Sequence, residues 1–285
     1  MDKIRKIKVT LKSKSTFEGA GVRLKRAFGY ADPSLDPFLL LDDFHSNDPR
    51  DYTAGFPWHP HRGIETITYM LHGKIEHGDS LGNGGVIKAG DVQWMTAGSG
   101  IIHQEMPKSN IKDPLLWGFQ LWSNLPASYK MMKPRYREIK KTQIPEISLD
   151  NNRIKIKIIS GEMNGEKGPV QDVITNPEYI DIKISPHSEF IHPVKKDHNV
   201  FAYAIEGEGY FDVQKEEIIS EETLVIFREG DAVKISTNDK MIRFLLISGK
   251  PLREPVAWRG PIVMNTDEEL QFAFEEYRKG TFIKH

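Results

Sequence analysis

The chain has 285 residues, and its 39 lysines and arginines nearly balance its 40 aspartates and glutamates. This length suffices for one large or two medium domains, and the near-zero charge argues against direct contact with nucleic acid. The absence of cysteine excludes disulfides, thiolate zinc sites, iron–sulfur clusters and cysteine nucleophiles. No stretch approaches the ~20 apolar residues of a membrane span, and the charged N-terminus lacks a signal-peptide core. We therefore expect a soluble protein of the cytoplasm that makes no contact with a membrane.

Short segments in which apolar and polar residues alternate predict β-strands along most of the chain. They lie at residues 7–11, 67–71, 119–121, 154–158, 180–184 and 201–205. Turn signals rich in glycine, asparagine and aspartate separate them, as at residues 82–85 and 207–209. Because no helical period appears before the last stretch of the chain, the predicted class is all-β.

An approximate internal repeat indicates two similar barrels. In the first half, the strand-like segment Tyr69–Gly73 is followed by a Gly-Asp turn at residues 90–91. In the second half, Tyr203–Gly207 is followed by a Gly-Asp turn at residues 230–231. Prolines and polar residues interrupt the strand pattern between residues 133 and 150. The prediction is one barrel at residues 1–135 and another at residues 136–285, with the end of the chain assigned to the second.

The end of the chain has the pattern of a helix. Thr266 and Glu269 have the spacing of a capping box, and Gly280 suits the C-terminal cap. Between them, one helical face carries four apolar residues: Leu270, Ala273, Phe274 and Tyr277. We expect an amphipathic helix that packs this face onto a barrel.

Two short clusters in the first half carry the chemistry: His59 with His61, and His103 with Glu105. Side chains two apart on a strand point to the same face, so each pair can present two donor atoms to one point. Three imidazoles and a carboxylate make a metal site of mixed nitrogen and oxygen character. Such ligands accommodate iron, manganese, cobalt, nickel, copper or zinc, and the order of affinities does not select one. Glu65 is an alternative fourth ligand, and His77 follows in a segment that can reach the mouth of the site.

Several longer motifs resemble the pirin family of the cupin superfamily. They lie at residues 36–44, 58–63, 91–98, 100–107, 134–136, 252–255 and 260–266. The resemblance implies a bicupin, with two cupin-type β-barrels, whose N-terminal barrel holds one non-haem iron. Carried over residue by residue, the implied ligands are His59, His61, His103 and Glu105. Two positions depart from the usual second cupin motif, since Gly98 replaces a proline and Pro107 an asparagine.

The same resemblance implies an enzyme, because several pirins show quercetin 2,3-dioxygenase activity. The substrates would be a small aromatic flavonol and O₂, and the cofactor Fe(II) or another divalent transition metal. Glu105 would act as the general base that takes the proton of the substrate hydroxyl. The flat ring system needs an apolar slot, and some of the nearby aromatic and sulfur-containing residues would wall it, among Trp58, Trp94, Met95, Trp117 and Trp122. We expect the second barrel to be metal-free, since it contains no His-x-His pair.

A second hypothesis, a regulatory protein without enzymatic activity, requires the same four metal ligands. Other pirins are non-enzymatic, iron-dependent regulators of transcription or metabolism, and the implied partner is then a protein. The balanced charge argues against direct binding of DNA by such a regulator. In a eukaryotic cell, a protein of this kind would be expected in the nucleus as well as the cytoplasm.

Overall fold

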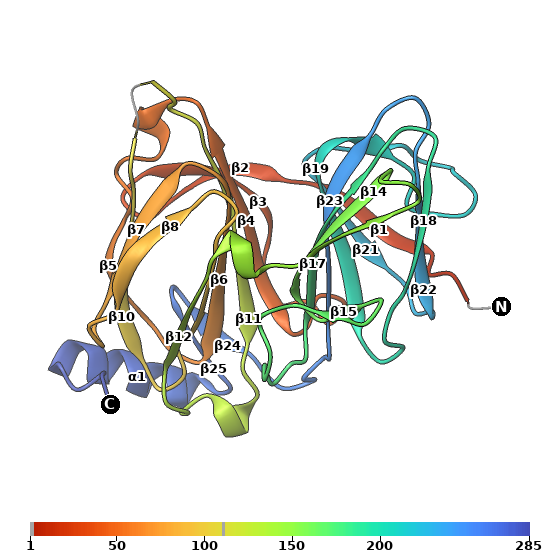
Figure 1. The fold of residues 1–285 in the computed structure, drawn as a ribbon. Coiled ribbons are helices and arrows are strands. Elements are labelled where there is room, and N and C mark those ends of the chain that lie inside the picture. The colour runs from red at the N-terminus through yellow and green to blue at the C-terminus, as the bar shows by residue number, and fades with distance from the viewer. Residues whose placement is uncertain (1–2, 110–111) are drawn as a thin grey trace. The chain divides into compact units, whose positions relative to one another are not determined.

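The computed structural model describes residues 3–109 and 112–285 (Figure 1). It divides into two compact units. One, which we call the first barrel, contains residues 14–31, 38–141 and 252–285. The other, the second barrel, contains the N-terminal segment up to Ser13 and residues 32–37 and 142–251. The predicted all-β class and the C-terminal helix are both confirmed.

The first barrel is built from two antiparallel sheets. The larger sheet has seven strands, in the order β12 (Arg135–Ile139), β9 (Val92–Thr96), β6 (Ile64–His72), β11 (Leu116–Asn124), β4 (Phe38–Ser46), β3 (Val22–Gly29) and β2 (Lys14–Glu18). The smaller sheet has four, in the order β5 (Phe56–His61), β10 (Ile101–Pro107), β7 (Lys74–Asp79) and β8 (Gly84–Lys88). Two short 3₁₀ helices, η1 (Pro49–Asp51) and η2 (Ala127–Tyr129), lie in its loops.

The second barrel repeats this plan. Its larger sheet follows the order β1 (Ile7–Lys12), β21 (Thr223–Phe227), β19 (Asn199–Gly209), β23 (Ile242–Gly249), β17 (Glu178–Ile184), β14 (Ile154–Ser160) and β13 (Glu146–Leu149), with β20 (Ile219–Ser220) paired to β19. Its short pairs are β18 (Glu189–Pro193) with β22 (Ala232–Ser236), and β15 (Glu162–Met163) with β16 (Glu166–Lys167). The 3₁₀ helix η3 (Lys141–Gln143) lies where the chain passes from one unit to the other.

The two barrels do repeat one order of strands. The prediction that the two Gly-Asp turns occupy the same place in this repeat is wrong. The turn at residues 90–91 leads into β9, a strand of the larger sheet. The turn at residues 230–231 leads into β22, which pairs with β18 as β10 pairs with β5. The Gly-Asp turns therefore belong to different hairpins, because two residues suffice for a tight turn at many places in a barrel.

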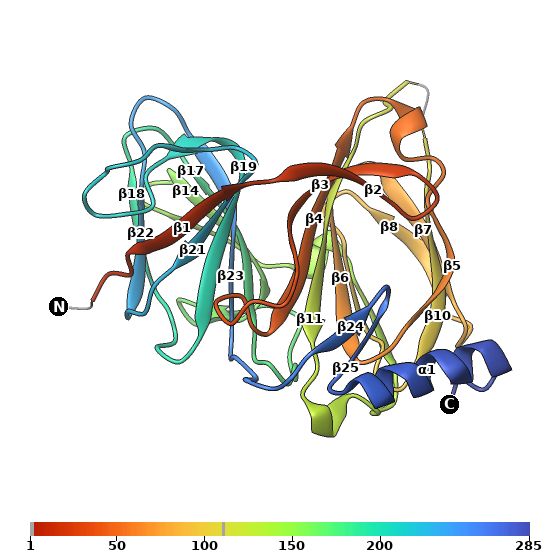
Figure 2. The same cartoon turned by 180° about the vertical axis from the view of Figure 1, so that it is seen from behind.

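Both ends of the chain differ from the predicted division at residue 135. Strand β1 completes the sheet of the second barrel, where Leu11 pairs with Leu224. The C-terminal helix, α1 (Asp267–Lys279), instead packs on the first barrel beside the hairpin of β24 (Ala257–Arg259) and β25 (Ile262–Met264) (Figure 2). The first barrel therefore contains the end of the chain, and the second contains its beginning.

The helix forms for the reasons the sequence indicates. The Thr266 hydroxyl accepts a hydrogen bond from the Glu269 N–H, and the Glu269 carboxylate accepts one from the Thr266 N–H. Gly280 ends the helix in the left-handed conformation. Leu270 and Ala273 are buried against β24 and β25, whereas Tyr277 of the predicted face remains exposed. No helix in the described ranges is long and apolar enough to cross a membrane.

Candidate metal centre

Strands β5 and β10 bring the three predicted histidines together. The two strands pair antiparallel, with His59 opposite His103 and His61 opposite Ile101. His59 and His61 lie two apart on one strand, so that both rings can turn to the side of His103. A left-handed glycine, Gly63, ends this segment, and a Cβ there would lie 1.9 Å from the Val263 carbonyl oxygen. Residues 59–63 thus place two histidines on a strand that ends in a sharp turn against β25.

The ring nitrogens of His59, His61 and His103 lie within 4.8 Å of one another, one from each side chain. The ring centroids are 4.4 to 5.0 Å apart. His61 and His103 are buried, and His59 is partly exposed. Burial lowers the pKa of all three side chains, well below the ordinary histidine value for His61 and His103. The cluster therefore favours neutral imidazoles, the form that binds metal ions.

Backbone carbonyls fix the tautomers of two of these rings. Nδ1 of His59 lies 2.8 Å from the Pro57 oxygen, and Nδ1 of His61 lies 3.0 Å from the Pro261 oxygen. Each Nδ1 carries the proton and donates it, which leaves the lone pair on Nε2. The two Nε2 atoms are 3.1 Å apart, and neither nitrogen of the His103 ring has a hydrogen-bond partner among the described residues. Converging lone pairs without donors are the arrangement that a cation satisfies, so the three histidines fit a metal ion.

Glu105 follows His103 on the same face of β10, but it does not belong to the group of atoms within 4.8 Å. It is buried, and its carboxylate accepts a 3.0 Å hydrogen bond from the Thr68 hydroxyl. The Gln120 side chain reaches the second carboxylate oxygen at 3.5 Å. Burial raises the pKa of Glu105 to about 7. The structure thus places Glu105 beside the histidines, and its role as fourth ligand stays a prediction.

Glu65, the alternative ligand, lies elsewhere. On β6 it is three residues from Thr68, so the two side chains point to opposite faces of the strand. Its carboxylate accepts a 2.6 Å hydrogen bond from the Thr96 hydroxyl, on the strand next to it. The face that carries Thr68 borders the histidines, and Glu65 does not line the cavity beside them. Because Glu65 points to the face of β6 away from the histidines, we no longer consider it a candidate ligand.

Comparison with known proteins decides the family. The model of the family named Pirin matches residues 21–123, and that of the pirin C-terminal cupin domain matches residues 179–283. The chain belongs to the pirin family. A pirin-like protein of Caulobacter vibrioides is 40% identical over 281 residues, which cover 98% of this chain and 99% of the relative. Pirin of Homo sapiens is 41% identical over 283 residues, which cover 98% of this chain and 94% of the relative.

A solved structure agrees over the whole length. The crystal structure of a quercetin 2,3-dioxygenase from Acinetobacter baumannii matches with a TM-score of 0.90 at 32% sequence identity. The match covers 98% of each chain. The pirin resemblance and the bicupin fold predicted from the sequence are therefore confirmed.

In this pirin, His59 and His61 border a cavity of about 940 Å³ in the first barrel. Trp58, Trp122 and Trp258 contribute aromatic surface to its wall, and Glu105 with Thr68 and Gln120 contributes polar surface. The Trp122 and Trp258 rings are 5.9 Å apart between centroids. A cavity of this size, largely apolar with a few fixed polar groups, is typical of small-molecule sites.

The sequence reasoning missed several residues of this site. Arg26 and Asp42 form a bidentate ion pair in the cavity wall, at 2.8 and 2.7 Å. Trp258 and the Pro261 carbonyl come from the hairpin near the C-terminus. A polar residue inside an apolar strand, such as Asp42 after Leu41, was the available signal for the ion pair. Nothing in the sequence indicates that the Pro261 carbonyl contacts His61, which lies 200 residues earlier in the chain.

His77 was expected near the mouth of the site and lies deeper. It belongs to β7, where it pairs with Glu105 in the neighbouring strand. Its ring stacks on Tyr136 at an interplanar angle of 8° and lies 5.6 Å from the His103 ring. His77 is buried and does not line the cavity. It packs against the His103 ring from the neighbouring strand β7.

Proposed function

We propose that this pirin is an iron-dependent dioxygenase that cleaves flavonols such as quercetin. The observation that carries the proposal is a cluster of three histidines, two of which border a cavity with three tryptophans in its wall. The similarity to a quercetin 2,3-dioxygenase over the whole chain supports the same reaction class. We assign the metal to His59, His61 and His103, with Glu105 as the fourth ligand.

In this proposal, the bound iron supplies Lewis acidity and redox chemistry for O₂. The residues of the chain do the rest. Trp58, Trp122 and Trp258 hold the flat ring system by stacking and exclude water from it. Glu105 would accept the proton of the flavonol 3-hydroxyl as a general base. Thr68 and Gln120 hold the carboxylate in place through hydrogen bonds.

The test is an assay of protein loaded with Fe(II) under air. We expect the long-wavelength absorbance of quercetin to fall with turnover, and carbon monoxide to appear in equal amounts. Glu105→Gln should lower kcat by about 10²- to 10⁴-fold, the usual contribution of a general base. Glu65→Gln is the matched control, because Glu65 lies on the opposite face of β6, and it should retain its activity. An iron-loaded wild type that leaves quercetin unchanged contradicts the proposal.

A regulatory function is the second candidate, and one observation favours it. Trp58 directly precedes His59 and is 53% exposed. An exposed tryptophan next to a metal ligand suits a protein contact that depends on the state of the metal. Pull-down with the Fe(II) and Fe(III) forms tests this candidate. Recovery of one partner by only one form, lost in Trp58→Ala, supports it, and identical recovery by both forms excludes it.

A further inference from the structure

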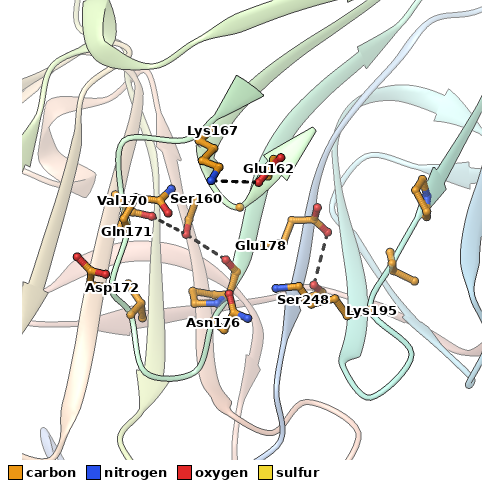
Figure 3. A pocket seen from close by; sticks show the side chains of 15 residues that line it. Ser160, Glu162, Lys167, Val170, Gln171, Asp172, Asn176, Glu178, Lys195 and Ser248 are labelled. Carbon is orange, nitrogen blue, oxygen red and sulfur yellow. Dashed lines mark hydrogen bonds and ion pairs between the residues drawn. The ribbon is translucent and has the colours of Figure 1, made fainter. Parts of the chain in front are cut away.

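The second barrel has a pocket of its own, which we call the second-barrel pocket (Figure 3). Its volume is about 430 Å³. It lies at one end of the barrel, where β17 begins with Glu178 and β23 ends near Ser248. These two residues face each other across the strand pair. Glu178 shares its strand face with Ile180, Ile182 and Ile184, which fill the barrel core.

Four polar side chains form a continuous hydrogen-bonded chain at this end. Glu178 Oε1 lies 2.8 Å from His192 Nε2, and its Oε2 lies 3.5 Å from the Ser248 hydroxyl. The Ser248 hydroxyl lies in turn 3.3 Å from His198 Nδ1. His192, His198 and Ser248 are buried. Burying four polar side chains next to an aliphatic core costs free energy of folding. The Ser248 contact at 3.5 Å is weak, so Glu178 Oε2 can still accept a hydrogen bond.

The wall of the pocket is fixed before any ligand binds. The segment from residue 161 to 177 crosses this end of the barrel, and Ser160 anchors it. The Ser160 hydroxyl lies 3.1 Å from the Val170 oxygen and 3.0 Å from the Pro177 oxygen, as the dashed lines in Figure 3 mark. The Lys250 N–H donates to the Thr175 oxygen at 3.1 Å. A pre-formed pocket does not require the ligand to order the chain.

The lining chemistry favours a cationic ligand with an apolar body. Three carboxylates line the pocket, Glu162, Asp172 and Glu178, against the two lysines Lys167 and Lys195. Lys167 lies 3.6 Å from Glu162, and both side chains are more than half exposed. The side chain of Glu178 is much less exposed, at 14%. Val170, Val173 and Val194 supply apolar surface around it.

We propose that the second-barrel pocket binds small primary amines, with the ammonium group on Glu178 and the hydrocarbon part on the valines. Charge-assisted hydrogen bonds to a carboxylate are stronger than neutral ones. The ammonium would donate to Glu178 Oε2, while His192 continues to donate to Oε1. This site is independent of the metal centre and of the proposed dioxygenase activity, because every residue of it belongs to the second barrel.

Three probes with one carbon skeleton test the proposal on the full chain. Isoamylamine, isoamyl alcohol and isovalerate differ only in the group at one end. Methyl NMR of Val173 and Val194 reports occupancy, and Val22 in the first barrel serves as the reference. We expect saturable shifts at Val173 and Val194 with isoamylamine, at least tenfold weaker binding of the alcohol, and no binding of isovalerate. Equal shifts with all three probes, or none with the amine, overturn the proposal.

Variants separate the carboxylate from the shape of the pocket. Glu178→Gln keeps the size of the side chain and should weaken isoamylamine binding at least tenfold. Glu162→Gln is the matched control at the exposed ion pair and should change the affinity less than twofold. Val173→Phe fills the pocket and should abolish the shift at Val194 with every probe. Should Glu178→Gln fail to fold, Val173→Phe decides, and unchanged amine binding in that variant contradicts the proposal.

Discussion

The two barrels have the same order of strands but different interiors. In the first barrel, β5 and β10 set His59 opposite His103. In the second, the corresponding pair β18 and β22 sets His192 opposite Val233, and Phe190 opposite Ile235. Val233 and Ile235 belong to the aliphatic core. One pair of short strands therefore decides which barrel presents converging histidines, while the larger sheets of both barrels share one strand order.

The interiors differ in packing as well as in chemistry. Isoleucines from β14 and β17 fill the second barrel, and the side chains of Phe244 and Leu246 complete this core. The first barrel instead carries Thr68, Gln120 and Glu105 on its inner faces and encloses the large cavity. In the first barrel, interior positions that could hold packed apolar side chains thus carry polar residues that line a cavity. Four predictions test this contrast, from the largest expected effect to the smallest.

His61→Ala should remove most of the bound metal. It deletes a ligand whose Nδ1 is already fixed by the Pro261 carbonyl, and we expect affinity to fall by more than about 100-fold, beyond the effect of losing an outer-shell partner. The barrel core does not include this side chain, so the melting temperature of the metal-free protein should change little. Metal analysis and thermal melting measure both. His192→Ala in the second barrel is the control, and equal metal loss in both variants would contradict the contrast.

Arg62→Met should destabilise the first barrel by about 3–5 kcal/mol, because it breaks the buried ion pair with Glu276 and leaves two backbone carbonyls without their donor. Arg62 is buried, and it donates to the Glu276 carboxylate at 2.7 Å and to the Ser99 and Phe282 oxygens. Urea unfolding measures the loss. Arg50→Met removes an ion pair on the exposed surface, with Asp48, and should leave the unfolding midpoint unchanged. Equal effects of the two substitutions would mean that the helix is not held by Arg62.

Truncating one core residue in each barrel should reveal the difference in packing. Ile182→Ala removes a side chain packed on all sides and should cost about 3–5 kcal/mol. Leu40→Ala enlarges a wall of the existing cavity and should cost nearer to about 2 kcal/mol. Both are measured by chemical denaturation under the same conditions. A larger loss at Leu40 would show that the first barrel is the more tightly packed.

His198 should make the second barrel sensitive to acid. Burial lowers the pKa of His198 to about 4, from an ordinary histidine value of 6.5. Between these pH values the unfolded chain binds more protons than the folded one, so stability is lost as the pH falls through this range. His198→Leu should reduce this loss by about 1–2 kcal/mol at pH 4.5 relative to pH 8. Parallel stability curves for the variant and the wild type would contradict the prediction.

The sequence predicted the parts of the site that depend on local spacing. Pairs of residues two apart on a strand identified His59, His61 and His103, because strand geometry fixes their common face. The sequence did not predict which barrel each end of the chain completes. Ile7 pairs with Phe227 and Arg62 with Glu276, and such partners more than 200 residues apart leave no local pattern. The two Gly-Asp turns were matched wrongly for a related reason. A turn sequence reflects local backbone geometry and does not show which strands of a sheet the turn connects.

The contacts of residues 61 and 62 have a consequence for how the metal centre is assembled. His61 depends on the carbonyl of Pro261, and its neighbour Arg62 depends on Glu276 and on the carbonyl of Phe282. During synthesis on the ribosome, all three histidines leave the exit tunnel long before these partners exist. The first barrel, although encoded first, can therefore finish its ligand strand only after the second barrel has been made. Metal added to a nascent chain that stops at residue 251 should accordingly find a His61 ring that the Pro261 carbonyl does not yet hold.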